Sequence, residues 1–278
     1  MSEVRDFGVS VRERRSGFGV IEGAESKLND KMPIALPILD DASALFLDVD
    51  GTLLEIAATP DAVVVPNGLT DVLQRLYQAL GGALALVSGR ALAELDMLFD
   101  PLRLPAAGQH GAELRRRGDV PGQSIGRDPR LDGFVRQLRV IAGERPGLLV
   151  EDKGLSVAVH YRLAPQYGEE VQAFATALLA ECGGDIELLP LRMGIEFKPR
   201  ATSKRTAVEW FLRAAPFHGR VPIFVGDDRT DEDGFAAALG QSGHALRVGL
   251  DGDSLASMRL ATPQDVRDWL ARCAAGLA

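Results

Sequence analysis

The sequence predicts an α/β fold in which a doubly wound parallel sheet with a Rossmann-like core carries an inserted α+β cap domain. Two observations lead to this prediction. Short apolar runs alternate with helical segments near the two ends of the regular part of the chain, a pattern typical of parallel strands buried on both faces. The middle of the chain instead has short strands that follow one another in pairs, which is typical of a small α+β unit.

Four apolar runs mark the strands of the predicted core. The predicted core elements are, in order, strand 44–47, helix 67–80, strand 83–87, a short helix, helix 204–214, strand 221–225 and strand 245–248. Three of these strands are followed by small or acidic polar residues, which begin at Asp48, Ser88 and Gly226. Because ligands bind at the carboxyl ends of the strands in open parallel sheets, we expect the functional site at these residues.

The inserted cap is expected to span residues 115–198, so the core comprises 41–114 and 199–278. Its predicted elements are helix 131–141, strands 148–150 and 156–161, helix 171–179, and strands 186–189 and 194–197. Residues 1–40 show no sustained helical or strand period. We interpret them as a mobile leader, and a dispensable extension is favoured over a regulatory or partner-binding tail.

Composition excludes several classes of partner. Asp and Glu number 39 against 31 Lys and Arg, so the field of the protein repels polyanions and a nucleic-acid partner is not expected. The chain has no run of about 18 apolar residues that would predict a membrane span. Cys182 and Cys273 fit no metal-ligand spacing, and the N-terminus has no secretory pattern. We expect a cytoplasmic monomer without a membrane partner.

An acidic hexapeptide at residues 48–53 is the most informative motif. Asp48 and Asp50 lie two positions apart on an extended segment, so their side chains share one side. Neighbouring carboxylates repel each other unless a cation neutralises them. The second acidic group, Asp227, Asp228 and Asp231, also follows a strand and should reach the same edge. Mg²⁺ is the natural counter-ion, because it takes one or two carboxylates and keeps sites for water and phosphate.

A calcium loop is the competing interpretation of aspartates spaced by two. Thr52 occupies its third acidic position, and no glutamate occupies its twelfth, so this interpretation fails.

Phosphoryl transfer instead needs a nucleophile, a proton shuttle and cations around the phosphoryl oxygens. Asp48 can attack phosphorus, Asp50 can move the proton, and Ser88 and Lys204 can bind the phosphoryl oxygens.

The order of these residues along the chain resembles a known superfamily. Asp48-Val-Asp-Gly-Thr, Ser88, Lys204 and Gly226-Asp-Asp-Arg-Thr-Asp follow one another as do the four motifs of haloacid dehalogenase-like phosphatases, and the insertion resembles their type-2 cap. Segments 108–113, 151–162, 196–199 and 226–232 are similar to the trehalose-6-phosphate phosphatase family. The resemblance covers about residues 40 to 275.

The resemblance implies a Mg²⁺-dependent phosphatase that hydrolyses trehalose 6-phosphate through an aspartyl-phosphate. Asp48 is then the nucleophile and Asp50 the general acid/base. Asp48, the Asp50 carbonyl and Asp227 bind the metal, with Asp228 and Asp231 around them. The residues expected to contact the sugar phosphate are Gly89, Arg90, His110, Glu113, Glu151, Lys153, His160, Arg162 and Glu196.

Alternatives remain for the phosphate-binding lysine and for the substrate. Arg205 stands where the family usually has glycine, so Lys198 competes with Lys204 for the phosphate-binding role, and Lys204 is favoured. Sucrose 6-phosphate and mannosyl-glycerate phosphate are rival substrates, which Glu151, Lys153 and Glu196 disfavour. A phosphomutase and a non-catalytic phospho-sugar sensor are the other rivals. The sensor should lack Asp48 or Asp50, and both are present.

Overall fold

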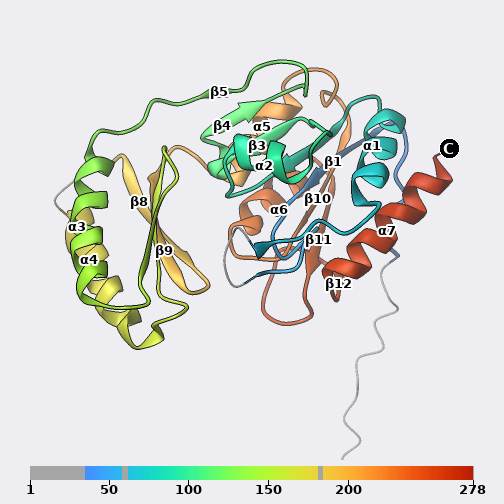
Figure 1. Ribbon diagram of the computed structural model, residues 1–278. Coiled ribbons are helices and arrows are strands. Elements are labelled where there is room, and N and C mark those ends of the chain that lie inside the picture. Colours follow the sequence, from blue (N-terminus) through green and yellow to red (C-terminus); the bar gives the residue numbers. More distant parts are fainter. Residues whose placement is uncertain (1–34, 58–61, 181–183, 278) are drawn as a thin grey trace, which may run out of the picture. The chain divides into compact units, whose positions relative to one another are not determined.

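The computed structural model describes residues 35–57, 62–180 and 184–277, which form two β-sheets with their helices (Figure 1). The larger sheet has eight strands in the order β12-β11-β10-β1-β2-β3-β4-β5, and the smaller has four in the order β6-β7-β9-β8. The predicted fold class, a mainly parallel α/β sheet with an inserted α+β unit, is confirmed.

The larger sheet forms the core. Its strands are β1 (Ser43–Leu47), β2 (Leu84–Val87), β3 (Ala106–Gly108), β4 (Glu113–Arg115), β5 (Gln123–Ser124), β10 (Val221–Gly226), β11 (His244–Val248) and β12 (Met258–Leu260). The six strands from β12 to β3 are parallel, while β4 and β5 pair antiparallel at one edge. Strand β1 consists of buried residues throughout, as expected for a central parallel strand covered on both faces.

Helices cover both faces of this sheet. They are α1 (Leu69–Ala79), α2 (Leu92–Leu98), α5 (Lys204–Leu212), α6 (Asp231–Leu239) and α7 (Pro263–Gly276). In Figure 1, α1 and α7 pack side by side on one face, and α5 and α6 lie together on the other. Among the described residues, none of the helices has the length and apolarity needed to cross a membrane.

The smaller sheet forms the cap. It consists of β6 (Leu149–Asp152), β7 (Val157–His160), β8 (Ile186–Leu191) and β9 (Gly194–Pro199), all antiparallel, and Figure 1 shows α3 (Arg130–Glu144) and α4 (Gly168–Ala180) on one of its faces. Because successive side chains of a strand point to opposite faces of the sheet, Val157 and Val159 share one face and lie in a separate hydrophobic core under these helices. Phe134 and Phe197 pack there with ring centroids 4.6 Å apart.

Two boundaries differ from the sequence-based expectation. Strand β4 pairs with β3 and β5 pairs with β4, so the core sheet continues to Ser124, past the expected start of the cap at residue 115. Most of the expected leader lies outside the described residues, but its last part belongs to the core. Leu39 is 3% exposed, and the Trp269 indole N–H donates to the Pro37 carbonyl at 3.3 Å. This segment is held by the burial of its apolar side chains, which leaves no periodic pattern in the sequence.

Arg116 stabilises the C-terminal end of α5. Its guanidinium lies 3.9 Å from the Trp210 ring centroid and donates to the Trp210 and Phe211 carbonyls at 2.8 and 3.2 Å. These carbonyls lie in the last turn of α5, where a cation is favourable. We expect Arg116→Ala to lower the free energy of unfolding by about 1–2 kcal/mol, measured by urea denaturation.

The neighbouring Arg117 provides the control for Arg116. Its ion pair with Asp119 is solvent-exposed, so Arg117→Ala should leave the free energy of unfolding unchanged within error. Equal losses of unfolding free energy in the two variants would mean that the contacts of Arg116 with α5 stabilise the protein no more than an exposed ion pair does.

Candidate active site

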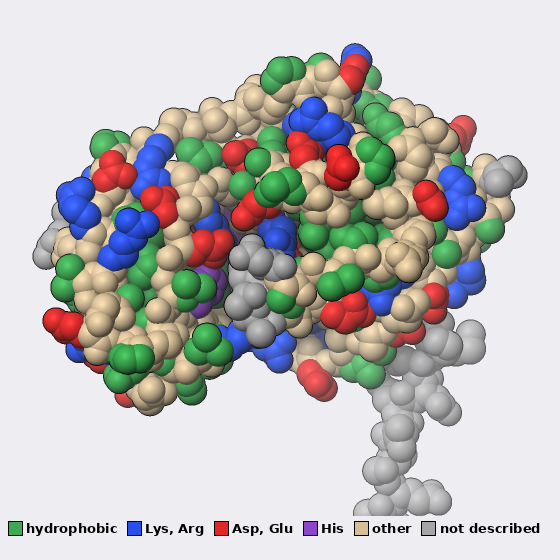
Figure 2. Space-filling view, in the orientation of Figure 1, with side chains coloured by type: hydrophobic (Ala, Val, Ile, Leu, Met, Phe, Trp, Pro, Cys, Tyr) green, Lys and Arg blue, Asp and Glu red, His purple; other side chains and the backbone are tan. Residues whose placement is uncertain are grey.

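The carboxyl ends of three adjacent strands build the site. Strand β1 lies between β10 and β2, with Leu47 in register with Val225 and with Leu86. The chain therefore leaves these strands at the same edge of the sheet, which brings Asp48, Ser88 and Asp227 together. Figure 2 shows acidic, basic and histidine side chains gathered beside the gap between the core and the cap.

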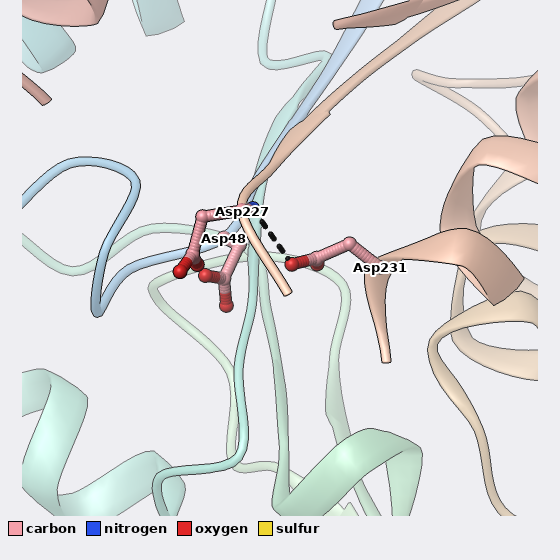
Figure 3. Close-up of side chains that lie close together, drawn as sticks. All are labelled: Asp48, Asp227 and Asp231. Carbon is pink, nitrogen blue, oxygen red and sulfur yellow. Dashed lines mark hydrogen bonds between the residues drawn. The ribbon is translucent and has the colours of Figure 1, made fainter. Parts of the chain in front are cut away.

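Three carboxylates converge at this edge. Each of Asp48, Asp227 and Asp231 offers an oxygen, and these oxygens lie within 4.8 Å of one another. Figure 3 shows Asp48 and Asp227 pointing to the same side and Asp231, from the first turn of α6, facing them. One Asp231 oxygen accepts hydrogen bonds from the main-chain N–H groups of Asp227 and Asp228 at 2.9 and 3.0 Å.

Lys204 is the cation inside this cluster. Its ammonium lies 2.7 Å from both Asp48 Oδ1 and Asp231 Oδ1. Ser203 caps α5 by accepting a hydrogen bond from the Thr206 N–H at 3.1 Å, which places Lys204 as the first residue of the helix. The helix start thus points the lysine at the carboxylates.

Lys198 contacts other groups. It forms an ion pair with Glu187 at 2.7 Å and donates to the Pro199 carbonyl at 3.3 Å and to the Thr202 carbonyl. These contacts lie at the end of β9 and in the chain that follows it. The geometry therefore places Lys204 at the acidic cluster and Lys198 away from it.

The cluster has more negative charge than its lysine neutralises. Burial, with Lys204 opposing it, raises the pKa of Asp48 and, more strongly, the pKa of Asp231. Burial and the nearby Asp48 raise the pKa of Asp227 to about 8. Burial alone would lower the pKa of Lys204, but Asp231 and Asp48 outweigh it and hold this pKa well above its usual range. A further cation would relieve the repulsion, so the residues present fit a divalent metal.

Two glycines make room for the carboxylates. Gly51 has φ 84°, and a Cβ there would lie 2.2 Å from Asp227 Oδ2. A Cβ at Gly226 would lie 2.1 Å from Asp231 Cγ. Any side chain at either position would displace a member of the cluster, because real Cβ contacts do not approach so closely.

Arg90, from the loop that follows β2, forms an ion pair with Asp50. The Arg90 Nε and Nη2 donate to the two Asp50 oxygens at 2.6 and 2.8 Å, and the hydrogen bond to Asp50 is the main reason that the pKa of Arg90 is raised. Ser88, buried at the end of β2, accepts a hydrogen bond from the Arg90 N–H at 3.2 Å. The acid/base candidate and the serine thus belong to one connected group.

A pocket of about 260 Å³ joins this cluster to the cap. The predicted site residues that line it are Asp48, Asp50, Ser88, Gly89, Arg90, His110, Glu151, Lys153, His160, Arg162, Glu196, Lys204 and Asp228. Ile56, Val63, Leu149 and Leu163 add apolar surface to the lining. The pocket therefore has the acidic cluster with Lys204 at its core end and a wall of charged hydrogen-bonding groups on the cap.

The cap wall carries one ion pair and one histidine–carboxylate hydrogen bond. Lys153 lies 3.0 Å from Glu196, and His160 lies 2.8 Å from Glu151. Burial alone would raise the pKa of Glu196, but Lys153 and then His110 outweigh it, so this pKa is far below its usual range. The Oε1 of Glu196 and the Nδ1 of His110 are buried without a partner in the described part of the chain.

Comparisons with known proteins identify the family. The Trehalose-phosphatase family matches residues 46–254. The trehalose-6-phosphate phosphatase of Escherichia coli (strain K12) is 42% identical over 242 residues, which cover 84% of this chain and 87% of that protein. This chain belongs to the trehalose-phosphatase family. A probable trehalose-phosphate phosphatase of Sinorhizobium fredii is 40% identical over 83% of the chain and 86% of that relative.

Solved structures share the fold of this trehalose-phosphatase family member. The C-terminal domain of the Candida albicans trehalose-6-phosphate phosphatase has a TM-score of 0.74 at 22% identity and covers 85% of this chain and 93% of that one. A trehalose-6-phosphate phosphatase related protein has a TM-score of 0.69 at 24% identity, with coverage of 83% and 96%. At these identities the likeness establishes the fold alone.

One predicted residue of this family member and one that was not predicted need comment. Glu113 is absent from the pocket lining: its carboxylate accepts the Leu92 N–H at 2.7 Å and satisfies the first turn of α2. The contact of Glu113 with the sugar phosphate stays a prediction, and in the structure its carboxylate is paired with this backbone N–H. Gln109 was not predicted, although it stands beside His110 in Gly108-Gln-His-Gly111. Its side chain contacts the cap, a contact that only the tertiary structure reveals.

Proposed function

We propose that this chain is a Mg²⁺-dependent phosphatase that hydrolyses trehalose 6-phosphate to trehalose and phosphate through an aspartyl-phosphate at Asp48. One observation carries the proposal. The Asp48–Asp227–Asp231–Lys204 cluster stands at one end of a pocket whose other wall presents the ion-paired polar groups of the cap. We propose that the protein acts as a monomer.

The first half-reaction transfers the phosphoryl group to the protein. An Asp48 carboxylate oxygen attacks phosphorus in line, and the bond from phosphorus to the sugar 6-oxygen breaks. Asp50 protonates the leaving oxygen once its carboxyl group is free of Arg90. Ser88 and Lys204 bind the phosphoryl oxygens, and their buried positions strengthen these interactions.

The second half-reaction regenerates Asp48. Asp50, now a carboxylate, takes a proton from a water molecule that attacks phosphorus, and the bond from phosphorus to the Asp48 oxygen breaks. Phosphate then leaves. A cap that covers the pocket keeps bulk water out until the sugar has departed.

The metal would be held by the acidic cluster. We assign its ligands to the Asp48 and Asp227 carboxylates and the Asp50 carbonyl, with Asp228 and Asp231 supporting them. When bound, Mg²⁺ supplies positive charge to the phosphoryl oxygens and to the crowded carboxylates. The raised pKa values of Asp48 and Asp227 support this assignment, because burial and the neighbouring carboxylates disfavour their charged forms and a further cation would favour them.

The cap would recognise the sugar. Glu151, Lys153 and Glu196 present acceptors and donors that each satisfy several hydroxyl groups, and a ligand without those hydroxyls leaves buried charges unpaired. We propose that Gly89, His110, His160 and Arg162 complete the contacts, because all four line the same pocket.

Phosphate release from a panel of sugar phosphates, with Mg²⁺ and with EDTA, tests the proposal. We expect kcat/KM for trehalose 6-phosphate to exceed that for sucrose 6-phosphate and glucose 6-phosphate by roughly 100-fold, the selectivity that several hydroxyl-specific contacts provide. EDTA should abolish turnover, and Mg²⁺ should restore it. Equal activity on glucose 6-phosphate would overturn the substrate, and full activity in EDTA would overturn the metal.

A further inference from the structure

Gln109 lies in a short turn that the core holds under strain. The turn Gln109–Gly111 connects β3 to β4, and its three residues have φ values of 45°, 54° and 94°. The left-handed region is unfavourable for the two residues that are not glycine, so surrounding contacts must impose it. The Gln109 N–H donates to the Arg90 carbonyl at 2.9 Å, and the His110 N–H donates to the Ser88 carbonyl at 3.0 Å.

The same turn reaches the cap through side chains. Gln109 is only 3% exposed, and its Oε1 accepts hydrogen bonds from the Leu155 N–H at 3.2 Å and the Ser156 hydroxyl at 3.5 Å. These two residues lie in the turn from β6 to β7, which also contains Lys153. The next side chain, that of His110, places Nε2 3.8 Å from Glu196 Oε2.

We propose that Gln109 is a positioning residue that fastens the cap to the core and thereby determines selectivity for large substrates. This inference rests on the proposed function. The backbone of the turn is bonded to the Ser88–Arg90 segment at the phosphate end of the pocket, and the Gln109 side chain is bonded to the β6–β7 turn at the sugar end. One residue thus sets the separation between the two ends.

A neutral amide suits this position. Its oxygen accepts from both cap donors, whereas a carboxylate would add another negative charge to a region that already contains Glu196. Gln109 itself does not line the pocket. Its effect on catalysis therefore passes through the placement of the cap, and only a substrate that touches cap and core together depends on it.

The variant Gln109→Leu tests this role, because leucine has a similar volume and lacks the acceptor. We expect kcat/KM for trehalose 6-phosphate to fall roughly 5- to 100-fold, the range for a lost hydrogen bond that leaves donors unpaired. Hydrolysis of p-nitrophenyl phosphate, which is too small to need the cap, should change by less than about threefold. Gln123→Leu, on exposed β5, is the matched control and should change neither rate.

Hydrogen exchange of the Leu155 amide provides a readout that does not depend on activity. Gln109 protects this amide in the wild type, so its exchange should be at least roughly fivefold faster in Gln109→Leu and unchanged in Gln123→Leu. A wild type without preference for trehalose 6-phosphate would contradict the proposed function, while the exchange result would still decide the fastening role. Unchanged exchange, or equal losses on both substrates, would overturn the role of Gln109.

Discussion

Asp48→Asn is expected to reduce phosphate release from trehalose 6-phosphate by roughly 10⁴-fold or more, because asparagine cannot form the acyl-phosphate that the proposed mechanism requires. The fold should persist. Lys204 retains its ion pair with Asp231 at 2.7 Å, and the substitution removes one of the crowded carboxylates. The melting temperature without Mg²⁺ should therefore stay the same or rise, because burial raises the pKa of Asp48 and disfavours its charged form.

Steady-state kinetics and differential scanning fluorimetry measure these two effects on the same sample. Asp71→Asn, at an exposed position in α1, is the matched control and should preserve both activity and melting temperature. If Asp48→Asn keeps more than a tenth of the wild-type rate, Asp48 is not the nucleophile. A collapse of the melting temperature would instead assign it a structural role.

Glu196→Gln should separate sugar recognition from phosphoryl chemistry. Glu196 is fully buried in the cap, with Lys153 at 3.0 Å, and one of its carboxylate oxygens has no partner among the residues that the structure describes. The glutamine keeps the shape but loses the charge and one acceptor. We expect kcat/KM for trehalose 6-phosphate to fall roughly 10²-fold, because the sugar hydroxyls and Lys153 lose a charged partner. For p-nitrophenyl phosphate the change should be less than about threefold.

A second substitution shows whether charge or fold is responsible. Glu196→Ala should cause an equal or larger loss on the disaccharide and also lower the melting temperature, because it leaves the Lys153 ammonium buried and unpaired. Glu169→Gln, at an exposed position in the first turn of α4, controls for the loss of one carboxylate in the cap. Equal losses on both substrates in a folded Glu196→Gln enzyme would show that Glu196 supports the core chemistry rather than the sugar.

Most of the sheet could be predicted because its parallel strands are buried on both faces. Strands β1, β2, β10 and β11 are apolar runs, so periodicity and hydrophobicity suffice to find them. Strand β3 escaped prediction because its sequence, Ala-Ala-Gly, lacks the branched and aromatic residues that favour strands. It exists because its backbone pairs with β4 across a short turn and with β2, from which α2 separates it along the chain.

The sequence by itself determined the acidic motif, because Asp48 and Asp50 are local neighbours whose spacing on an extended segment sets their orientation. Only the tertiary structure decided which distant groups join them. Strand order places β10 beside β1, which brings Asp227 to Asp48, and the start of α5 directs Lys204 to the cluster while Lys198 turns to Glu187. The hydrogen bonds of Glu113 with α2 and of Gln109 with the cap could not be predicted either, because such contacts depend on chain packing and leave no local pattern in the sequence.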